Sequence, residues 1–447
     1  MFQFQSNILT QNPPGDYGGI SVADVDGDGR FEVLVARSNG PNRILKWVGN
    51  QLRDVAPPML ADAGRSTLGF AAADIDGDGR EELYLLNASA DRLLQRGADG
   101  QWFDLFERPE NHLHCDTSNC CGIAALDRRG VGRYGFFSTH RDRRPRLLEL
   151  GADGLLSDLA QSVGLQANLA GGVVAAPIHG VQTDLICSNE RGANAAYRNL
   201  GSGTFEDCAG LWNLTDAKEC GQGIVALDAD GDGRLDLFWG NADGPHRLMM
   251  RDSGTSWRDR ATPSLAFPSA LGSIVAADFD NDGYEELFLN NRGEPNRLYR
   301  VRDSITMLEL GDALEPEALG TGAAVLDLDG DGVLELIVAH GEPSPEPIAV
   351  YKARGTTGNA WLRIRPLTRH GAPARGAAVR ASVGGRILVR VIDGGSGTRC
   401  QMEPIAHFGL GRAPKVEWVS VTWPDGASLT MPNPDVNCNY TVPYPRG

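Results

Sequence analysis

The chain has 447 residues, of which 58 are acidic and 42 are Lys or Arg, so its formal net charge is −16. This acidity opposes binding to nucleic-acid phosphates, and we expect no nucleic-acid partner. No apolar run reaches about 18 residues, so no transmembrane segment is predicted. Residues 1–5 lack the basic and apolar parts of a signal peptide, which argues against that route of export unless a signal is missing from this sequence.

The first predicted elements are short strands joined by turns. Phe2 to Gln5 has the character of an outer strand, and the Asp-rich loop 24–32 follows a strand of small residues. The strands expected around this loop and after it lie at 19–23, 31–35, 43–47 and 52–55. Four strands with their turns need about 40–50 residues, which is the size of one propeller blade.

The same pattern recurs along the chain. Its Asp-rich turn begins at residues 24, 74, 127, 228, 278 and 327, and one further copy has Pro177 in the Asp position. A spacing of about 50 residues is typical of blades that bury their faces only against neighbouring blades. We therefore predict an all-β chain with a seven-bladed β-propeller over residues 1–353, whose last blade is completed by the N-terminal strand.

Five of these turns carry carboxylates at loop positions 1, 3, 5 and 9 and Gly at position 6. Ca²⁺ prefers about six to eight oxygen ligands, and alternate residues of a tight turn converge on one point. Position 7 is expected to offer its backbone carbonyl, so its side chain is free to vary. The predicted ligands of five calcium sites are Asp24, Asp26, Asp28, Arg30 and Glu32; Asp74, Asp76, Asp78, Arg80 and Glu82; Asp228, Asp230, Asp232, Arg234 and Asp236; Asp278, Asp280, Asp282, Tyr284 and Glu286; and Asp327, Asp329, Asp331, Val333 and Glu335.

An EF-hand also begins with this Asp pattern, but it needs Glu at position 12 and helical flanks. Position 12 here is Val35, Leu85, Trp239, Leu289 or Val338, and the flanking runs resemble strands. Turns without any metal are also disfavoured, because four converging carboxylates would repel one another. The number of carboxylates and the flexible loop favour Ca²⁺ over Mg²⁺.

Two repeats depart from the pattern. The third keeps only Asp127, and Arg128 and Arg129 follow it, so a guanidinium could replace the cation there. The fourth, at 177–180, has no set of ligands. We predict that neither binds calcium.

A second, smaller domain is predicted at 357–447 after a short linker. Its expected strands alternate as half-buried strands do and lie at 361–365, 378–383, 386–392, 416–423 and 428–431. We interpret it as a transthyretin-like β-sandwich that packs rigidly on the propeller. The Gly-rich run at 393–398 lacks the end of a phosphate-binding loop, so we expect the segment through Glu403 to insert into or cap the propeller channel.

The eight cysteines allow several states. Cys208 and Cys220 could form a disulfide, and Cys115 could bridge to Cys120 or Cys121. Cys187 and Cys400 are expected to be buried free thiols. His112, His114 and these neighbouring cysteines could instead bind zinc, but their spacing matches no standard ligand set.

Several phrases show a resemblance to a known family; they lie at 241–248, 311–317, 392–397, 402–411 and 422–426. Together with the loops they resemble the cartilage acidic protein 1 family, which joins FG-GAP/VCBS-type propeller repeats to an ASPIC/UnbV module. Vertebrate members add an EGF-like calcium module before which this chain ends, so it resembles a bacterial-type or truncated member, and a receptor-related role is in doubt. The resemblance also allows monovalent cations between blades, near the turn carbonyls at Gly40, Gly244 and Gly293.

Two classes of function remain open. The first is a non-enzymatic, calcium-stabilised scaffold for recognition or adhesion, monomeric, with a protein or glycan ligand. Extracellular calcium levels would fill such sites, so a secreted or envelope-associated location is expected. The second is a propeller enzyme acting on glycans as a hydrolase or lyase. It would need a compact catalytic set, and the sequence has no G-x-S-x-G, no H-E-x-x-H and no carboxylate pair outside the metal loops.

Overall fold

The computed structural model describes residues 1–5, 7–115, 120–252, 256–302, 304–341, 343–354, 358–413 and 415–446. The chain is all-β, as predicted, with only short helical pieces. These are α1 (Pro58–Ala61), α2 (Ala209–Trp212), η1 (Leu105–Glu107), η2 (His112–His114) and η3 (Asp312–Leu314). Among the described residues, no helix has the length and apolar character needed to span a membrane.

Within the described part of residues 1–354, the strands form seven four-stranded antiparallel sheets. In chain order of their first long strand the sheets are β2 (Tyr17–Ala23), β3 (Glu32–Arg37), β4 (Arg43–Val48), β5 (Gln51–Asp54); β6 (Thr67–Ala73), β7 (Glu82–Asn87), β8 (Arg92–Arg96), β9 (Trp102–Asp104); β10 (Cys120–Leu126), β11 (Gly135–His140), β12 (Arg146–Leu150), β13 (Leu156–Asp158); β14 (Val173–Ala176), β15 (Asp184–Cys187), β16 (Ala195–Asn199), β17 (Phe205–Asp207); β18 (Gly221–Leu227), β19 (Asp236–Asn241), β20 (Arg247–Arg251), β21 (Trp257–Asp259); β22 (Leu271–Ala277), β23 (Glu286–Asn291), β24 (Arg297–Val301), β25 (Ile305–Met307); and β26 (Gly320–Leu326), β27 (Glu335–His340), β28 (Ala349–Ala353) with β1 (Phe2–Phe4).

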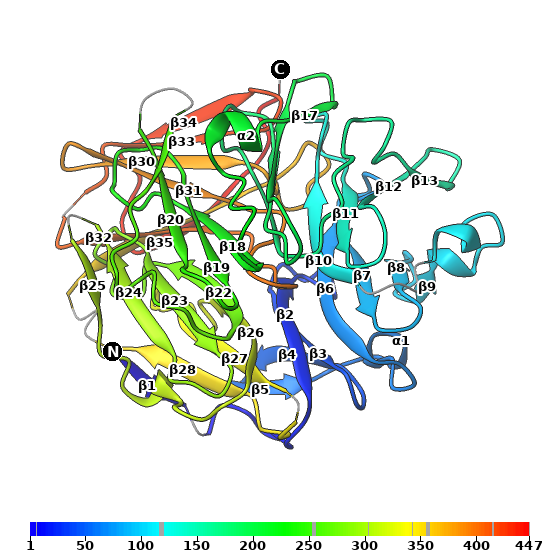
Figure 1. Cartoon of the computed structure of the whole chain (residues 1–447), viewed down its shortest axis with the longest axis horizontal. Coiled ribbons are helices and arrows are strands. Elements are labelled where there is room, and N and C mark those ends of the chain that lie inside the picture. The colour runs from blue at the N-terminus through cyan, green and yellow to red at the C-terminus, as the bar shows by residue number, and fades with distance from the viewer. Residues whose placement is uncertain are drawn as a thin grey trace.

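The first long strand of each sheet lies toward the middle of the molecule, and we call these strands the inner strands (Figure 1). They contact one another in order, from β2 through β6, β10, β14, β18 and β22 to β26, which contacts β2 in turn. Their small residues allow this close approach: a Cβ on Gly272 would lie 2.0 Å from the carbonyl oxygen of Gly320, and one on Gly322 would lie 2.4 Å from that of Gly18. The arrangement is propeller-like.

The N-terminal strand completes the sheet of β26, β27 and β28. β1 pairs antiparallel with β28, with Phe2 opposite Ala353 and Phe4 opposite Tyr351. The ring of Phe2 is buried and meets Phe279 edge-on, with the ring centroids 4.9 Å apart. Burial of this aromatic ring fixes the strand in place.

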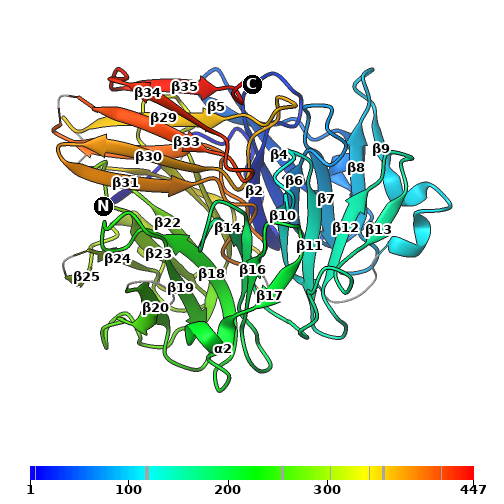
Figure 2. The ribbon, with the colours of Figure 1, turned by 90° about the horizontal axis from the view of Figure 1, so that it is seen from above.

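The C-terminal region forms two further sheets, seen together at one side of the molecule in Figure 2. One has the order β32-β29-β35 and the other β31-β30-β33-β34. Their strands are β29 (Ala360–Pro366), β30 (Ala378–Val383), β31 (Arg386–Val391), β32 (Ala406–Gly411), β33 (Trp418–Thr422), β34 (Ser428–Pro432) and β35 (Cys438–Val442). Side chains of both sheets, such as Leu362, Phe408 and Val419, share one hydrophobic core, so the two sheets stabilise each other.

The segment 393–401, between β31 and β32, lies among the inner strands, as we expected of the Gly-rich loop. Gly394 accepts a hydrogen bond from Ala125 of β10 and donates one to Ala175 of β14, and Gly397 exchanges two with Ile224 of β18. The Gln401 side chain makes two hydrogen bonds with the backbone of Ala72 in β6. The C-terminal region is thus bonded to the centre of the repeats.

The cysteines correct one prediction. Within the described part of the chain, Cys208 and Cys220 are free thiols, so the disulfide considered between them is not formed. Cys187 and Cys400 are buried free thiols, as predicted. The thiols of Cys115 and Cys120 each donate a hydrogen bond to a backbone carbonyl, of Asp91 and Gly122 respectively. Residues 116–119 of that loop lie outside the described residues.

Candidate metal centres

Each Asp-rich loop follows the C-terminal end of an inner strand and has the same hydrogen bonds. The carboxylate at position 1 accepts the amide hydrogen of Gly at position 6, over N–O distances of 2.9, 3.0, 3.1, 2.9 and 3.0 Å for Asp24, Asp74, Asp228, Asp278 and Asp327. The carboxylate at position 9, which begins the next strand, accepts the amide hydrogen of position 2. The loop thereby fixes one oxygen of each of these carboxylates. The second oxygen of the position 1 carboxylate accepts another loop amide in Asp74, Asp278 and Asp327, and it accepts no hydrogen bond among the described residues in Asp24 and Asp228.

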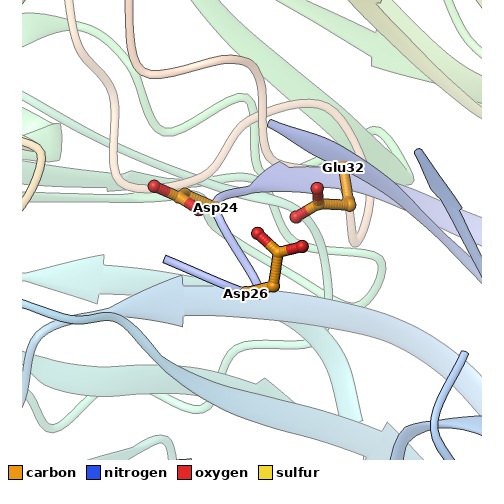
Figure 3. A group of neighbouring side chains, drawn as sticks. All are labelled: Asp24, Asp26 and Glu32. Carbon is orange, nitrogen blue, oxygen red and sulfur yellow. The ribbon is translucent and has the colours of Figure 1, made fainter. Parts of the chain in front are cut away.

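In all five loops, three of the four predicted carboxylates come within 4.8 Å of one another. Figure 3 shows Asp24 and Asp26 of the first loop beside Glu32 at the start of β3, with the carboxylates of Asp26 and Glu32 facing each other. The groups are Asp24, Asp26, Glu32; Asp74, Asp76, Asp78; Asp228, Asp230, Asp236; Asp278, Asp280, Asp282; and Asp327, Asp329, Glu335. Among the described residues, the third and fourth repeats and the His112 loop contribute no such group.

Several buried oxygens in these clusters have no hydrogen-bond partner among the described residues. They include Oδ1 of Asp24, Oδ1 of Asp228 and Oε1 of Glu286. A buried carboxylate oxygen without a partner is costly. A hard cation such as Ca²⁺ binds oxygens of this kind, so the residues present fit a divalent cation.

The electrostatics of the loops support the same interpretation. Burial, reinforced by the neighbouring carboxylate of Asp76, raises the pKa of Glu82 to about 9. Burial likewise raises the pKa of Asp236 and of Glu335 to about 8. Crowded and buried carboxylates hold protons more tightly because their negative charges are poorly solvated. A bound cation would offset this repulsion.

The residue that faces position 9 from the third strand of the sheet differs between loops. It is Lys46 in the first loop, and its Nζ lies 2.5 Å from Oδ2 of Asp26, 2.8 Å from Oδ2 of Asp28 and 2.9 Å from Oε1 of Glu32. In the seventh loop Lys352 makes the same three ion pairs, with Asp329, Asp331 and Glu335. The equivalent residues are Gln95, Met250 and Arg300 in the second, fifth and sixth loops. The spacing of the acids along the chain did not indicate these neighbours.

The residues at position 7 have different surroundings. In each loop their amide N–H donates to the aspartate at position 5. The side chains of Arg80 and Arg234 form ion pairs with that aspartate in their own loop, Asp78 and Asp232. The ring of Tyr284 lies under the guanidinium groups of two arginines. Their backbone carbonyls as metal ligands stay a prediction.

The third repeat has its own partly buried charge pair. The guanidinium of Arg128 makes two hydrogen bonds with Glu149, at 2.5 and 3.0 Å. Glu149 occupies in β12 the strand position that Lys46 occupies in β4. In this repeat the loop therefore supplies the positive charge through Arg128, and the strand supplies the negative charge through Glu149. In the first loop the loop supplies the negative charges and the strand supplies the positive charge through Lys46.

The C-terminal region lies directly on the loops. Arg363 donates to Oδ2 of Asp327 at 3.1 Å. The guanidinium of Arg390 lies 3.6 Å from Oδ2 of Asp278, which also accepts the amide hydrogen of Gly409 at 2.9 Å. Position 1 of these loops is therefore held by the loop and by the C-terminal region together.

Comparison with known proteins agrees with this architecture. Residues 367–447 match the ASPIC and UnbV family, and residues 24–85, 182–239, 228–289 and 278–338 match the FG-GAP-like repeat. The chain is therefore a protein of FG-GAP-like repeats followed by an ASPIC/UnbV module.

Whole-chain relatives define the family. Cartilage acidic protein 1 of Xenopus tropicalis is 38% identical over 97% of this chain and 75% of its own length, and that of Homo sapiens is 38% identical over 97% and 73%. The chain belongs to the cartilage acidic protein 1 family. Among solved structures, virginiamycin B lyase from Staphylococcus aureus aligns with a TM-score of 0.49 and 12% identity, covering 79% of this chain and 99% of that one.

Proposed function

We propose that the chain is a non-enzymatic, calcium-stabilised scaffold for recognition or adhesion. In this proposal residues 1–353 form a closed seven-bladed β-propeller, and 357–447 form a transthyretin-like β-sandwich docked on it. The order of contacts among the inner strands, in which β26 meets β2, supports closure of the ring. The core shared by the two C-terminal sheets supports the sandwich.

Calcium would be held by the carboxylates at positions 1, 3, 5 and 9 of the five loops and by the carbonyls at position 7. Bound Ca²⁺ would supply a divalent positive charge that offsets the crowded carboxylates. The observation that carries the proposal is that three carboxylates of each of the five loops lie within 4.8 Å of one another. Five such loops beneath one module indicate a structural role.

The location and the ligand follow as further parts of the proposal. Sites of this kind fill at extracellular calcium levels, which favours a secreted or envelope-associated protein. The partner would be a protein or a glycan. Monovalent cations between the blades stay a minor part of the proposal.

Chelation tests the structural role of calcium. The protein with Ca²⁺ should bind about five ions by elemental analysis and unfold at a higher temperature than the same protein in EDTA, because a ligand at 100 times its Kd adds about 2.7 kcal/mol per site. Asp228→Asn should bind one calcium ion fewer and should lose part of the rise in unfolding temperature that calcium gives. Glu206→Gln, at an exposed acid of β17, should change neither the number of bound ions nor the unfolding temperature.

Two results would contradict the proposal. The absence of any bound calcium, with equal unfolding temperatures in Ca²⁺ and EDTA, would exclude a structural role for the ions. Turnover of a glycan that a single acid or His substitution abolishes, with folding intact, would favour the enzyme alternative.

A further inference from the structure

A cavity of about 450 Å³ opens at the end of the inner strands opposite the metal loops. The metal loops follow the C-terminal ends of these strands, whereas the cavity is lined by residues at or just before their N-terminal ends. All seven sheets contribute to it, through Tyr17, Thr67, Cys121, Gly172, Gln222, Leu271 and Thr321. Its volume falls in the range of small-molecule sites, about 300–1,000 Å³.

The charge of this cavity is opposite to that of the whole chain. Three arginines line it, Arg141, Arg292 and Arg399, and Glu190 is the one acidic residue of the lining. Glu190 is already neutralised, because Arg141 donates two hydrogen bonds to it at 2.9 and 2.8 Å. Within the described residues, no ion pair is formed by Arg292 or by Arg399. The lining thus carries two uncompensated positive charges in a chain of net charge −16.

Arg399 lines the cavity, and its backbone conformation is unfavourable for a residue that carries a side chain. Its φ is +57°, and it is the one arginine with positive φ among the described residues. Left-handed backbone at a residue other than Gly, Asn or Asp is strained, and such strain is concentrated at functional sites. A Cβ on Gly69 would lie 2.8 Å from the Cβ of Arg399, so a neighbouring glycine makes room for it.

The segment around Arg399 is also held rigidly. On one side of Arg399 the amide of Gly397 donates to Ile224, and on the other the amide of Gln401 donates to Ile20. Nη2 of Arg399 donates to the carbonyl of Cys120 at 3.1 Å, and its Nε has no hydrogen-bond partner among the described residues. The guanidinium is therefore held in place before any ligand arrives, which lowers the entropic cost of binding.

The rest of the lining is polar and small. Hydroxyl groups of Ser38, Ser66, Thr67, Thr321 and Thr398 and glycine backbones predominate over apolar side chains. Oε1 of Gln222 lacks a hydrogen-bond donor among the described residues. The hydroxyl groups of Ser38 and Thr321 already donate to backbone carbonyls, so they can still accept a hydrogen bond from a ligand hydroxyl. A planar guanidinium suits a carboxylate, which it can bind through two hydrogen bonds.

We propose that this cavity binds a small hydroxylated carboxylate, of the class of a hexuronic acid residue, with its carboxylate on Arg399 and with Arg292 adding positive charge to the same lining. The negative charge of the whole chain repels anions at long range. Binding of an anion therefore requires the local arginines. The site is separate from the calcium loops, so either proposal can fail without the other.

Calorimetric titration of the full chain, with calcium held constant, tests the proposal with three probes. Sodium glucuronate should bind, whereas glucose, which lacks the charge, and acetate, which lacks the hydroxyls, should bind about tenfold more weakly or not at all. If glucose bound as tightly as glucuronate, the role of the arginines would be contradicted. If acetate bound as tightly as glucuronate, the role of the hydroxyl partners would be contradicted. No binding of glucuronate would overturn the proposal.

Two variants locate the site. Arg399→Gly accepts the positive φ and should fold, and Arg292→Gln changes an exposed side chain; each should weaken glucuronate binding by about tenfold or more. Arg380→Gln, at an exposed arginine of β30, is the matched control and should bind as the natural chain does. Unchanged affinity in both cavity variants would overturn the assignment.

Discussion

At the scale of single residues, the five metal loops differ most in what faces their last carboxylate. An ammonium group enters the first and seventh loops, a guanidinium approaches the sixth, and the uncharged Gln95 and Met250 face the second and fifth. A positive side chain among the carboxylates offsets part of their repulsion, but it also competes with an arriving cation. The loops should therefore differ in affinity.

Reciprocal substitutions test this difference. Lys46→Met should raise the calcium affinity of the first loop by about threefold to tenfold, because it removes partly exposed ion pairs worth roughly 1 kcal/mol. Met250→Lys should lower the affinity of the fifth loop to a similar extent. Calorimetric titration with calcium measures both. If both variants changed the calcium affinity in the same direction, or if neither changed it, competition between lysine and calcium would be contradicted.

The clustering of acidic side chains in the five Asp-rich loops could be predicted from the sequence, whereas the neighbours of these clusters could not. Positions 1 to 9 lie within nine consecutive residues, so their spacing reports the local turn directly. Arg363 and Asp327 are 36 residues apart, and Arg390 and Asp278 are further apart still, so no local pattern relates them. The proximity of Cys208 and Cys220 in the sequence was equally uninformative. Cys208 directly precedes α2 and packs in a hydrophobic core cluster that does not include Cys220, which directly precedes β18.

At the scale of elements, the segment 393–401 joins the C-terminal region to the inner strands. The position of Gly394 leaves no space for a side chain, since a Cβ would lie 1.9 Å from the carbonyl oxygen of Ala125. The contact is with backbone, which cannot rotate away. The fit of this segment therefore depends on its glycines.

Gly394→Ala should lower the free energy of unfolding by about 1–3 kcal/mol or more, because overpacking forces the backbone apart. Urea denaturation measures this change. Gly64→Ala is the matched control, since its Cβ would meet nothing within 4 Å, and it should change stability by about 0.5 kcal/mol or less. Equal stability of the two variants would show that the segment yields to the added methyl group.

Strand positions were predictable to within a few residues where apolar and polar residues alternate. The predicted strands at 19–23 and 361–365 are β2 and β29, which extend one or two residues further. β32 and β35 were missed. β32 contains two glycines, and β35 is short, half-exposed and paired in parallel with β29. A strand stabilised by its neighbours carries little signal of its own.

At the scale of the whole molecule, a buried ion pair connects the second loop with the C-terminal region. Nε of Arg375 lies 2.9 Å from Oε1 of Glu81, and the two side chains are 1% and 3% exposed. Burial raises the pKa of Glu81, and the guanidinium of Arg375 opposes that change. Neither charge has access to water, so each depends on the other.

Arg375→Met should lower the free energy of unfolding by about 3–5 kcal/mol, because it leaves the charge of Glu81 buried and unpaired. The double variant Arg375→Met with Glu81→Leu should recover much of this loss, since no charge then remains buried. Urea denaturation of both variants measures the difference. A double variant as unstable as the single one would show that packing, and not the charge, holds the two regions together.

The sheet of β1, β26, β27 and β28 joins residues 2–4 to residues 320–353. During synthesis on the ribosome β1 emerges first, and the sheet cannot be completed until β28 has emerged. Throughout that interval Phe2 is exposed, and when β28 emerges its edge is open to any strand that reaches it first. A second copy of the chain carries the same strand. Where ribosomes are crowded on one messenger, neighbouring chains should therefore exchange their N-terminal strands more often. Slower initiation of translation should favour completion of the sheet within one chain.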